Sequence, residues 1–370
     1  MTQRKILLIA GTRPNFIKLA PLYHRLKERP GFEIFICHTG QHFDFNMSDV
    51  FWDNLELPRP DFNLNIQGNG AADTIGKTIL GINEVIRSGT FDLVVVFGDV
   101  NATAAGAIAS AQSQVPVMHV EAGLRSFDRA MPEEINRIIT DHVSDFLMVS
   151  EPSGIANLEK EGFDRASYEL VGNIMIECLL KTKAQWENAV LPGDLEALLA
   201  ERPVVMTFHR PENVDHQDTL SRLVDIISEL AGGMKVIFPI HPRTKAKLGG
   251  FGLLEKVSGH PGITLTEPLG YFHFLKIVSR SGLVVTDSGG IQEETSFLNI
   301  PCITFRKNTE RPVTVVTGTN LMMDIWDQHF AEKISAHLQK ISNRAYRPIP
   351  LWDDEVSRRI TDFIEKRLQH

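Results

Sequence analysis

The stretch that decides the fold is residues 283–294, which read Leu283-Val284-Val285-Thr286-Asp287-Ser288-Gly289-Gly290-Ile291-Gln292-Glu293-Glu294. An apolar run followed by small residues and then by helix-forming residues is typical of a buried strand, a tight turn and a helix. Gly289 and Gly290 let the backbone approach a diphosphate, to which Ser288 and the first amides of the helix donate hydrogen bonds. Glu294, one turn into the helix, is placed to reach a ribose hydroxyl pair.

Similar apolar, β-branched runs recur between amphipathic stretches, as in strands buried on both faces of a parallel sheet. A first series predicts strands at 6–10, 33–37, 93–97, 115–119, 146–149 and 169–171. A second series predicts strands at 204–208, 235–240, 263–266, 283–286, 302–305 and 320–323. The sequence therefore predicts an α/β protein with two Rossmann-like domains, residues 1–172 and 173–350, and a central cleft.

The last segment, residues 351–370, has an apolar stripe at helical spacing. It is expected to form a helix that packs back on the first domain, with a plain surface helix as the alternative.

Bulk composition narrows the class of protein. A chain of 370 residues is long enough for two domains. The formal net charge of −8 argues against a nucleic-acid partner. The first apolar run is too short for a signal peptide or a membrane span, and the three cysteines, Cys37, Cys178 and Cys302, form no paired motif. A cytoplasmic protein with no membrane partner, no disulfide and no metal site is expected.

In the first domain, charged residues follow three predicted strands. Arg13 and Lys18 flank the start of a helix, which is an anion site. A solvated basic residue beside a turn is the alternative for either residue alone, and it is less plausible for both together. Three acids approach one sheet edge from separate segments, and carboxylates gathered there can supply a proton donor beside an acceptor. They are Asp99, Glu121 and Glu133. A helix cap is an equally good interpretation of Asp99. Glu133 or its neighbour Glu134 could instead serve only to start a helix, where acids are favoured.

In the second domain, two histidines follow corresponding strand ends. His209 and His241 at such positions favour substrate contact over a purely structural role. Metal binding by either is not expected, because no companion ligand motif accompanies them. Arg306 and Arg311 bracket Thr309 and Glu310, offering charge to the same diphosphate, with a surface salt bridge as the alternative.

Together these motifs resemble the non-hydrolysing UDP-N-acetylglucosamine 2-epimerases over nearly the whole chain. The resemblance rests on seven segments: Gly11-Thr12-Arg13-Pro14 with Lys18, Gly98-Asp99, His119-Val120-Glu121-Ala122-Gly123-Leu124-Arg125, Pro132-Glu133-Glu134 with Asn136-Arg137, His209-Arg210 with Glu212-Asn213, residues 287–294 and Thr309-Glu310-Arg311-Pro312.

This resemblance implies a glycosyltransferase-B-like fold and inversion at C2 of a UDP-N-acetylhexosamine through loss and return of UDP, with no cofactor. It implies UDP and a UDP-sugar as ligands and a homodimer. The implied catalytic residues are Asp99, Glu121, Glu133 and His209. The implied substrate-binding residues are Arg13, Ser288, Gly289, Gly290 and Arg311 for the diphosphate, Glu294 for the ribose, Phe274 for the uracil, and Lys18, Arg137 and His241 for the sugar.

The chain departs from the family pattern in several places. Asn15 stands where a glutamate is usual, and Pro211 where many bacterial members have a second arginine. The loop from Glu121 to Glu133 also looks shorter than in the best-known members. Gln41-His42, which is kept from the stretch that forms the family's allosteric substrate site, is followed here by Phe43-Asp44. Allosteric activation by UDP-N-acetylglucosamine is therefore not expected.

The amino-acid sequence of residues 40–48 and 126–128 is closer to that of relatives that act on UDP-2,3-diacetamido uronic acids. The identity of the sugar substrate is therefore left open. Among the alternative functions, a hydrolysing epimerase ranks second. A glycosyltransferase and a catalytically silent binding module of the same fold rank lower.

Overall fold

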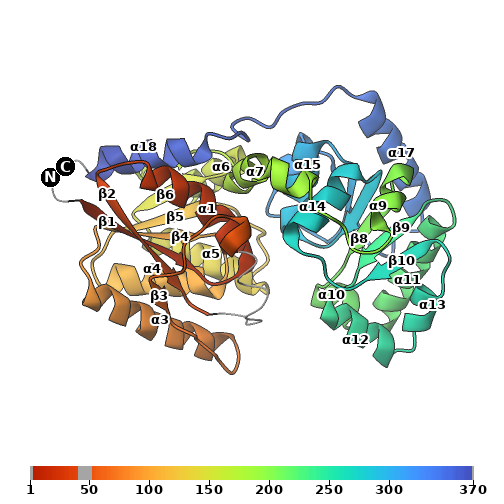
Figure 1. Cartoon of the computed structure of the whole chain (residues 1–370), viewed down its shortest axis with the longest axis horizontal. Helices are drawn as coiled ribbons and strands as arrows, with labels where there is room; N and C mark the ends of the chain where they lie inside the picture. Colours follow the sequence, from red (N-terminus) through yellow and green to blue (C-terminus); the bar gives the residue numbers. More distant parts are fainter. Residues whose placement is uncertain (1–2, 41–51, 369–370) are drawn as a thin grey trace. The chain divides into compact units, whose positions relative to one another are not determined.

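The computed structural model describes residues 3–40 and 52–368, and it divides the chain into two compact units. The first unit comprises residues 1–182 and 350–370, and the second comprises residues 183–349. Figure 1 shows each as a sheet with helices on both faces. Residues 41–48, which belong to the segment compared above with the diacetamido uronic acid relatives, lie outside the described residues.

The first unit is built on a parallel sheet whose described strands run in the order β3-β2-β1-β4-β5-β6-β7. These strands are β1 (Arg4–Ala10), β2 (Phe32–His38), β3 (Phe62–Asn63), β4 (Leu93–Phe97), β5 (Val117–Ala122), β6 (Phe146–Val149) and β7 (Tyr168–Leu170). The helices are α1 (Arg13–Lys27), α3 (Ala71–Ser88), α4 (Asn101–Gln112), α5 (Pro132–Val143), α6 (Pro152–Lys160), η1 (Arg165–Ser167), α7 (Ile174–Lys181) and α18 (Val356–Leu368). Every residue of β4 is buried, as expected for a central strand covered on both faces.

The second unit repeats this plan with strands in the order β10-β9-β8-β11-β12-β13, all parallel. They are β8 (Val204–Thr207), β9 (Val236–Pro239), β10 (Ile263–Thr266), β11 (Leu283–Thr286), β12 (Cys302–Phe305) and β13 (Asn320–Met323). Its helices are α8 (Lys183–Glu187), α9 (Leu195–Leu198), η2 (Leu199–Glu201), α10 (Pro211–Val214), α11 (Gln217–Ala231), α12 (Pro242–Gly250), α13 (Leu254–Ser258), α14 (Tyr271–Arg280), α15 (Gly289–Leu298), α16 (Pro312–Val316) and α17 (Phe330–Asn343). Two Rossmann-like α/β domains are therefore confirmed.

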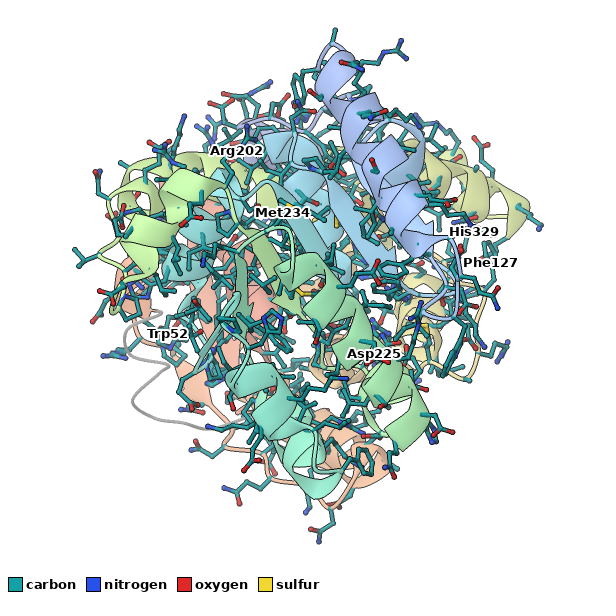
Figure 2. The ribbon with its side chains drawn as sticks, turned by 90° about the vertical axis from the view of Figure 1, so that its right-hand side faces the viewer. Trp52, Phe127, Arg202, Asp225, Met234 and His329 are labelled. Atoms are coloured by element: carbon teal, nitrogen blue, oxygen red, sulfur yellow. The ribbon has the colours of Figure 1, made fainter. Side chains whose placement is uncertain are left out.

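The second unit has an exposed ion pair on α11. On α11, the exposed side chain of Asp225, which is labelled in Figure 2, pairs with Lys256 at 2.7 Å. Both side chains are about half exposed, so the pair contributes little to stability.

Three sequence expectations need correction. The strand expected at 115–119 lies two residues later, so Glu121 is inside β5 rather than after it. The short edge strand β3 was missed, because two residues carry too little pattern to detect. The first unit runs to Thr182 rather than to residue 172, because α7 packs against α1 and α18.

The C-terminal segment belongs to the first unit, where α18 buries Val356, Ile360 and Ile364 against α1 and α7. The buried carboxylate of Glu177 on α7 accepts hydrogen bonds from the amide and hydroxyl of Ser357, both at 2.5 Å. In the described part of the chain, no helix is long and apolar enough to cross a membrane.

Candidate functional site

Glu121 and Lys18 form a buried ion pair in the first unit. Their side chains are 3% and 6% exposed, with Oε2 of Glu121 at 2.5 Å from Nζ of Lys18. Glu121 has φ 77°, a left-handed conformation rare for residues other than glycine, and the β5–β6 register shifts beside it. Backbone strain of this kind costs of order 1–3 kcal/mol and gathers at functional sites. The side chain is thus held in place by a cation and by the local backbone.

Asp99 follows β4, the strand next to β5 in the sheet. It does not cap α4, whose N-cap residue is Val100. Instead its Oδ2 lies 2.5 Å from Nη2 of Arg137, and its main-chain carbonyl accepts from Nδ2 of Asn136 at 2.9 Å. Arg137 is almost fully buried. The helix-cap reading of Asp99 is therefore wrong, and its carboxylate faces a fixed positive charge.

The two glutamates at the start of α5 have different environments. Glu134 is buried and accepts from the main-chain amides of Ser126 and Phe127 at 2.8 and 2.9 Å, and also from Arg137 at 3.0 Å. These contacts hold the loop that follows Arg125, which makes Glu134 the structural member of the pair. Glu133 is half-buried in the first turn of the same helix.

Asn15 explains one departure from the family pattern. Its side-chain oxygen accepts from the amides of Gly11 and Thr12 at 3.0 and 3.1 Å, while its Nδ2 donates to the carbonyl of Phe97 at 2.9 Å. A glutamate could accept from the amides but could not donate to Phe97. Asn15 thus ties the turn after β1 to the end of β4. Arg13, at the first position of α1, is exposed.

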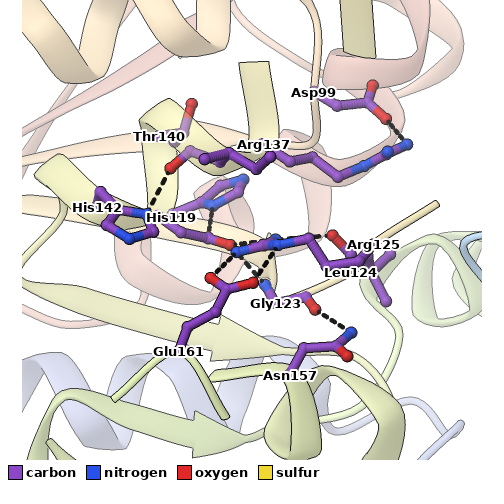
Figure 3. A network of polar contacts seen from close by, with 12 residues as sticks. Asp99, His119, Gly123, Leu124, Arg125, Arg137, Thr140, His142, Asn157 and Glu161 are labelled. Atoms are coloured by element: carbon purple, nitrogen blue, oxygen red, sulfur yellow. Dashed lines mark hydrogen bonds and ion pairs between the residues drawn. The ribbon is translucent and has the colours of Figure 1, made fainter. Parts of the chain in front are cut away.

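A buried polar network joins β5 to α5 behind these acids (Figure 3). The ring of His119 lies between Asp141 and the carbonyl of Gly98, at 2.7 Å from each. Asp141 also accepts from Arg125 at 2.7 Å. Burial alone would raise the pKa of Asp141, but His119 and Arg125 outweigh it and the pKa lies below the ordinary value. Sequence reasoning singled out neither Asp141 nor its link to His119, because no motif spacing connects them.

In the second unit, Asp287 anchors the loop after β8. Its buried carboxylate accepts from the amides of His209 and Arg210 at 3.1 and 3.0 Å, and from Nδ2 of Asn213 at 3.1 Å. It also lies 3.0 Å from Nδ1 of His209. Burial raises the pKa of Asp287, but these hydrogen bonds lower it below the ordinary value. The contact assigns a proton to Nδ1 and leaves Nε2 as the other ring nitrogen of His209, whose side chain is 40% exposed.

The helix α15 begins at the glycine pair, beside a buried cluster of charges. Arg311 lies 3.0 Å from Glu293 and 2.8 Å from Glu310, which also pairs with Arg306 at 3.0 Å. A Cβ on Gly289 would lie 2.9 Å from Nη1 of Arg311, so a larger residue there would crowd the guanidinium at the helix start. The surface salt bridge considered for these arginines is wrong, because the ion pairs are buried.

Three other predicted residues of the second unit lie on α12, α14 and α15. Nδ1 of His241 caps α12 by accepting from the amide of Arg243 at 3.1 Å. Phe274 is half-buried on α14. Glu294 is buried on α15 and accepts from the hydroxyl of Tyr271 at 3.1 Å. The pKa of Glu294 is raised to about 8, mainly by burial and also by the charge of Glu293, while the hydrogen bond from Tyr271 opposes the shift. At neutral pH this carboxyl group therefore carries a proton.

The raised pKa of Glu294 predicts a pH-dependent stability. Between pH 4.5 and about 8 the folded chain keeps a proton that the unfolded chain releases. The stabilisation is complete below about pH 4.5 and is lost as the pH rises through about 8, at up to about 1.4 kcal/mol per pH unit. The test is thermal unfolding of Glu294→Gln and of wild type between pH 5 and 9. The stability of the variant should lack this part of the pH dependence.

The control for this series is Glu196→Gln, because that side chain is 61% exposed in the same unit. Its pH dependence should match wild type. A Glu294→Gln curve parallel to wild type would show that Glu294 ionises normally in the folded chain.

The sites collect at the carboxyl ends of parallel strands, next to the positions where strand order reverses, which is where ligands bind in such sheets. One unit has a glycine-rich helix start, and the other has two carboxylates on neighbouring strands. Together with the fold, these features define a class of protein, the nucleotide-sugar enzymes of glycosyltransferase-B-like fold. The family model of UDP-N-acetylglucosamine 2-epimerase matches residues 24–365. The chain therefore belongs to the UDP-N-acetylglucosamine 2-epimerase family.

Individual relatives agree with this assignment. A UDP-N-acetylglucosamine 2-epimerase of Methanococcus maripaludis is 39% identical over 322 residues, 86% of this chain and 87% of that protein. A UDP-2,3-diacetamido-2,3-dideoxy-D-glucuronate 2-epimerase of Pseudomonas aeruginosa is 38% identical over 86% of this chain and 88% of its own. The crystal structure of the Methanocaldococcus jannaschii UDP-GlcNAc 2-epimerase in complex with UDP-GlcNAc and UDP superposes with a TM-score of 0.87 at 37% identity, covering 98% of this chain and 99% of that one.

Proposed function

We propose that the protein interconverts UDP-N-acetylglucosamine and UDP-N-acetylmannosamine, or a close analogue, without releasing free sugar. A carboxylate takes the proton from C2 while the C1–O bond breaks in an anti elimination and its electron pair leaves with UDP. The product is a 2-acetamidoglucal. A proton added to the opposite face of C2, with return of UDP to C1, gives the epimer. The balance of this reaction requires no redox cofactor.

The observation that carries this proposal is the pair of carboxylates at neighbouring strand ends. Glu121 is paired with Lys18 and Asp99 with Arg137, and Oε1 of Glu121 lies 4.0 Å from where a Cβ of Gly98 would be. Two acids on neighbouring strands of one sheet can serve as proton acceptor and proton donor for one carbon. Glu133, half-buried at the start of α5, is the third proposed acid. Lys18 and Arg137 hold the acids and balance their charge.

The second unit would bind the nucleotide. Ser288, Gly289 and Gly290 offer the start of α15 to the diphosphate, with Arg311 beside it and Arg13 as a further cation. Protonated Glu294 can both donate to and accept from the ribose hydroxyls. Phe274 would lie against the uracil and His241 near the sugar. His209, oriented by Asp287, would assist the proton transfers.

The test is NMR of the purified protein with UDP-N-acetylglucosamine in deuterated water. Deuterium at C2 together with a mixture of two UDP-sugars supports the proposal. Accumulating UDP and free sugar would replace it with the hydrolysing reaction.

If nothing exchanges, the UDP-2,3-diacetamido uronic acid is the second candidate substrate, supported by the 38% identical Pseudomonas relative. Failure with both would overturn the proposal. We also propose a cytoplasmic homodimer, which light scattering would report as twice the mass of the chain.

A further inference from the structure

We infer that Asp141 and His119 are positioning residues that fix the spacing between Asp99 and Glu121, with His119 acting as a buried imidazolium. The inference rests on the proposed function of those two acids. It comes from the buried network around His119 and Arg125, which are labelled in Figure 3. In this network the carboxylate of Asp141 on α5 binds His119, which in turn binds Gly98, and it also accepts from the amide of Gly123.

The protonation of His119 follows from its two partners. Its ring is fully buried, with Nε2 at 2.7 Å from the carbonyl oxygen of Gly98 and Nδ1 at 2.7 Å from Oδ1 of Asp141. A carbonyl oxygen only accepts, so Nε2 donates. Asp141 is a carboxylate, because the guanidinium of Arg125 at 2.7 Å from its Oδ2 stabilises the ionised form and its pKa lies below the ordinary value. Nδ1 therefore donates as well. A ring that donates from both nitrogens carries a positive charge.

On the Asp99 side, His119 fixes the peptide that leads into the acid. Gly98 has φ 65°, and a Cβ there would lie 2.6 Å from Nζ of Lys18, so this turn is tightly confined. The carbonyl of Gly98 is bound by His119, and that of Asp99 by Asn136 at 2.9 Å. Two consecutive carbonyls are thus anchored to β5 and α5, which sets the direction of the Asp99 side chain toward Arg137.

On the Glu121 side, Asp141 fixes the chain two residues beyond the acid. Its Oδ2 accepts from the amide of Gly123 at 3.1 Å, and Asn157 donates to the carbonyl of Gly123 at 2.9 Å. A Cβ on Gly123 would lie 2.6 Å from the carbonyl of Gly154, so the segment has no room to relax. The strained backbone of Glu121 is therefore held against α5 and α6 by contacts that include Asp141.

The network is electrically balanced within the unit. Arg125 donates from Nη1 to Asp141 at 2.7 Å, and from Nε and Nη2 to the two oxygens of Glu161 at 2.8 and 2.7 Å. Two cations thus face two carboxylates, which offsets the cost of burying the charges. Glu161, 27% exposed, contacts neither His119 nor the backbone near the acids, so it is the natural control.

The kinetic experiment compares Asp141→Asn with Glu161→Gln in the full chain. A misplacement of the acids by a fraction of an ångström should lower kcat for C2 exchange by about 10- to 100-fold in Asp141→Asn. The dissociation constant of UDP should change less than twofold, because the proposed UDP contacts other than Arg13 lie in the second unit. Glu161→Gln should keep kcat within about twofold of wild type, even if its melting temperature falls. Equal loss of kcat in both variants would assign the network to stability and overturn the inference.

The second measurement is made on the wild-type protein, and a variant serves only to assign the signal. In wild-type protein with 15N-labelled histidine at pH 8, where an exposed histidine is mostly neutral, His119 should show protons on both ring nitrogens. Its signal is assigned by its loss in His119→Gln. A single ring proton on His119 would overturn the inference whatever the activity. If wild type fails to exchange C2 with either sugar, the proposed function falls, and the ring signal still decides the protonation of His119.

Discussion

Glu121→Gln is expected to lower kcat for C2 proton exchange by about 10²- to 10⁴-fold, the usual contribution of a positioned acid or base. Glutamine keeps the size of the side chain but cannot take up a proton. Binding of UDP should be nearly unchanged, because the residues proposed to hold it are elsewhere. Deuterium incorporation at C2 and calorimetric titration with UDP measure the two quantities on the same sample.

The same substitution is expected to lower stability, because it leaves the 6% exposed Lys18 without its counter-charge. Removing one partner of a buried ion pair costs about 3–5 kcal/mol. The matched control is Glu33→Gln, which breaks the exposed pair with Lys5, whose atoms are 3.9 Å apart. That variant should match wild type in both stability and exchange. A folded Glu121→Gln protein with wild-type exchange would remove Glu121 from the proton transfer.

The sequence predicts those parts of the fold and site that rest on local pattern. The apolar run before Asp287 and the small residues after it are enough to locate β11 and the start of α15. The ion pair between Lys18 and Glu121 is different, because it joins residues on two separate elements. No spacing rule predicts that contact, although each residue was a candidate for the site.

The positioning residues were harder to find. Asp141 lies in the last turns of α5, where its sequence neighbours suggest only an ordinary helix. Its importance comes from the burial of the carboxylate and from its three donors, His119, Arg125 and Gly123, which the fold brings together. Asp287 is similar, since the sequence drew attention only to the residues that follow it, whereas its contacts show that it clamps the His209 loop. Roles that depend on long-range packing cannot be deduced from local periodicity.

Gly172→Ala is expected to destabilise the first unit strongly and to release the returning C-terminal segment. Gly172 has φ 91°, and a Cβ there would lie 1.9 Å from the carbonyl oxygen of Leu351. Positive φ alone costs an alanine about 1 kcal/mol. The clash adds to this, because the backbone of Leu351 is bound by Arg359, which donates to that same oxygen at 3.0 Å. A total loss of about 3 kcal/mol or more is expected, among the larger effects of single substitutions.

Gly162→Ala separates the two causes, because Gly162 has φ 85° in the same unit but open space around its notional Cβ. It should lose only the cost of the backbone conformation. Urea unfolding followed by tryptophan fluorescence suits the comparison, since buried Trp352 donates to the carbonyl of Ser150 at 3.1 Å and reports on docking of the C-terminal segment. If that fluorescence signal is lost at a lower urea concentration in Gly172→Ala, but not in Gly162→Ala, the close approach of residues 172 and 351 stabilises this unit. Equal losses would mean that the segment shifts to accommodate a methyl group and that φ alone matters.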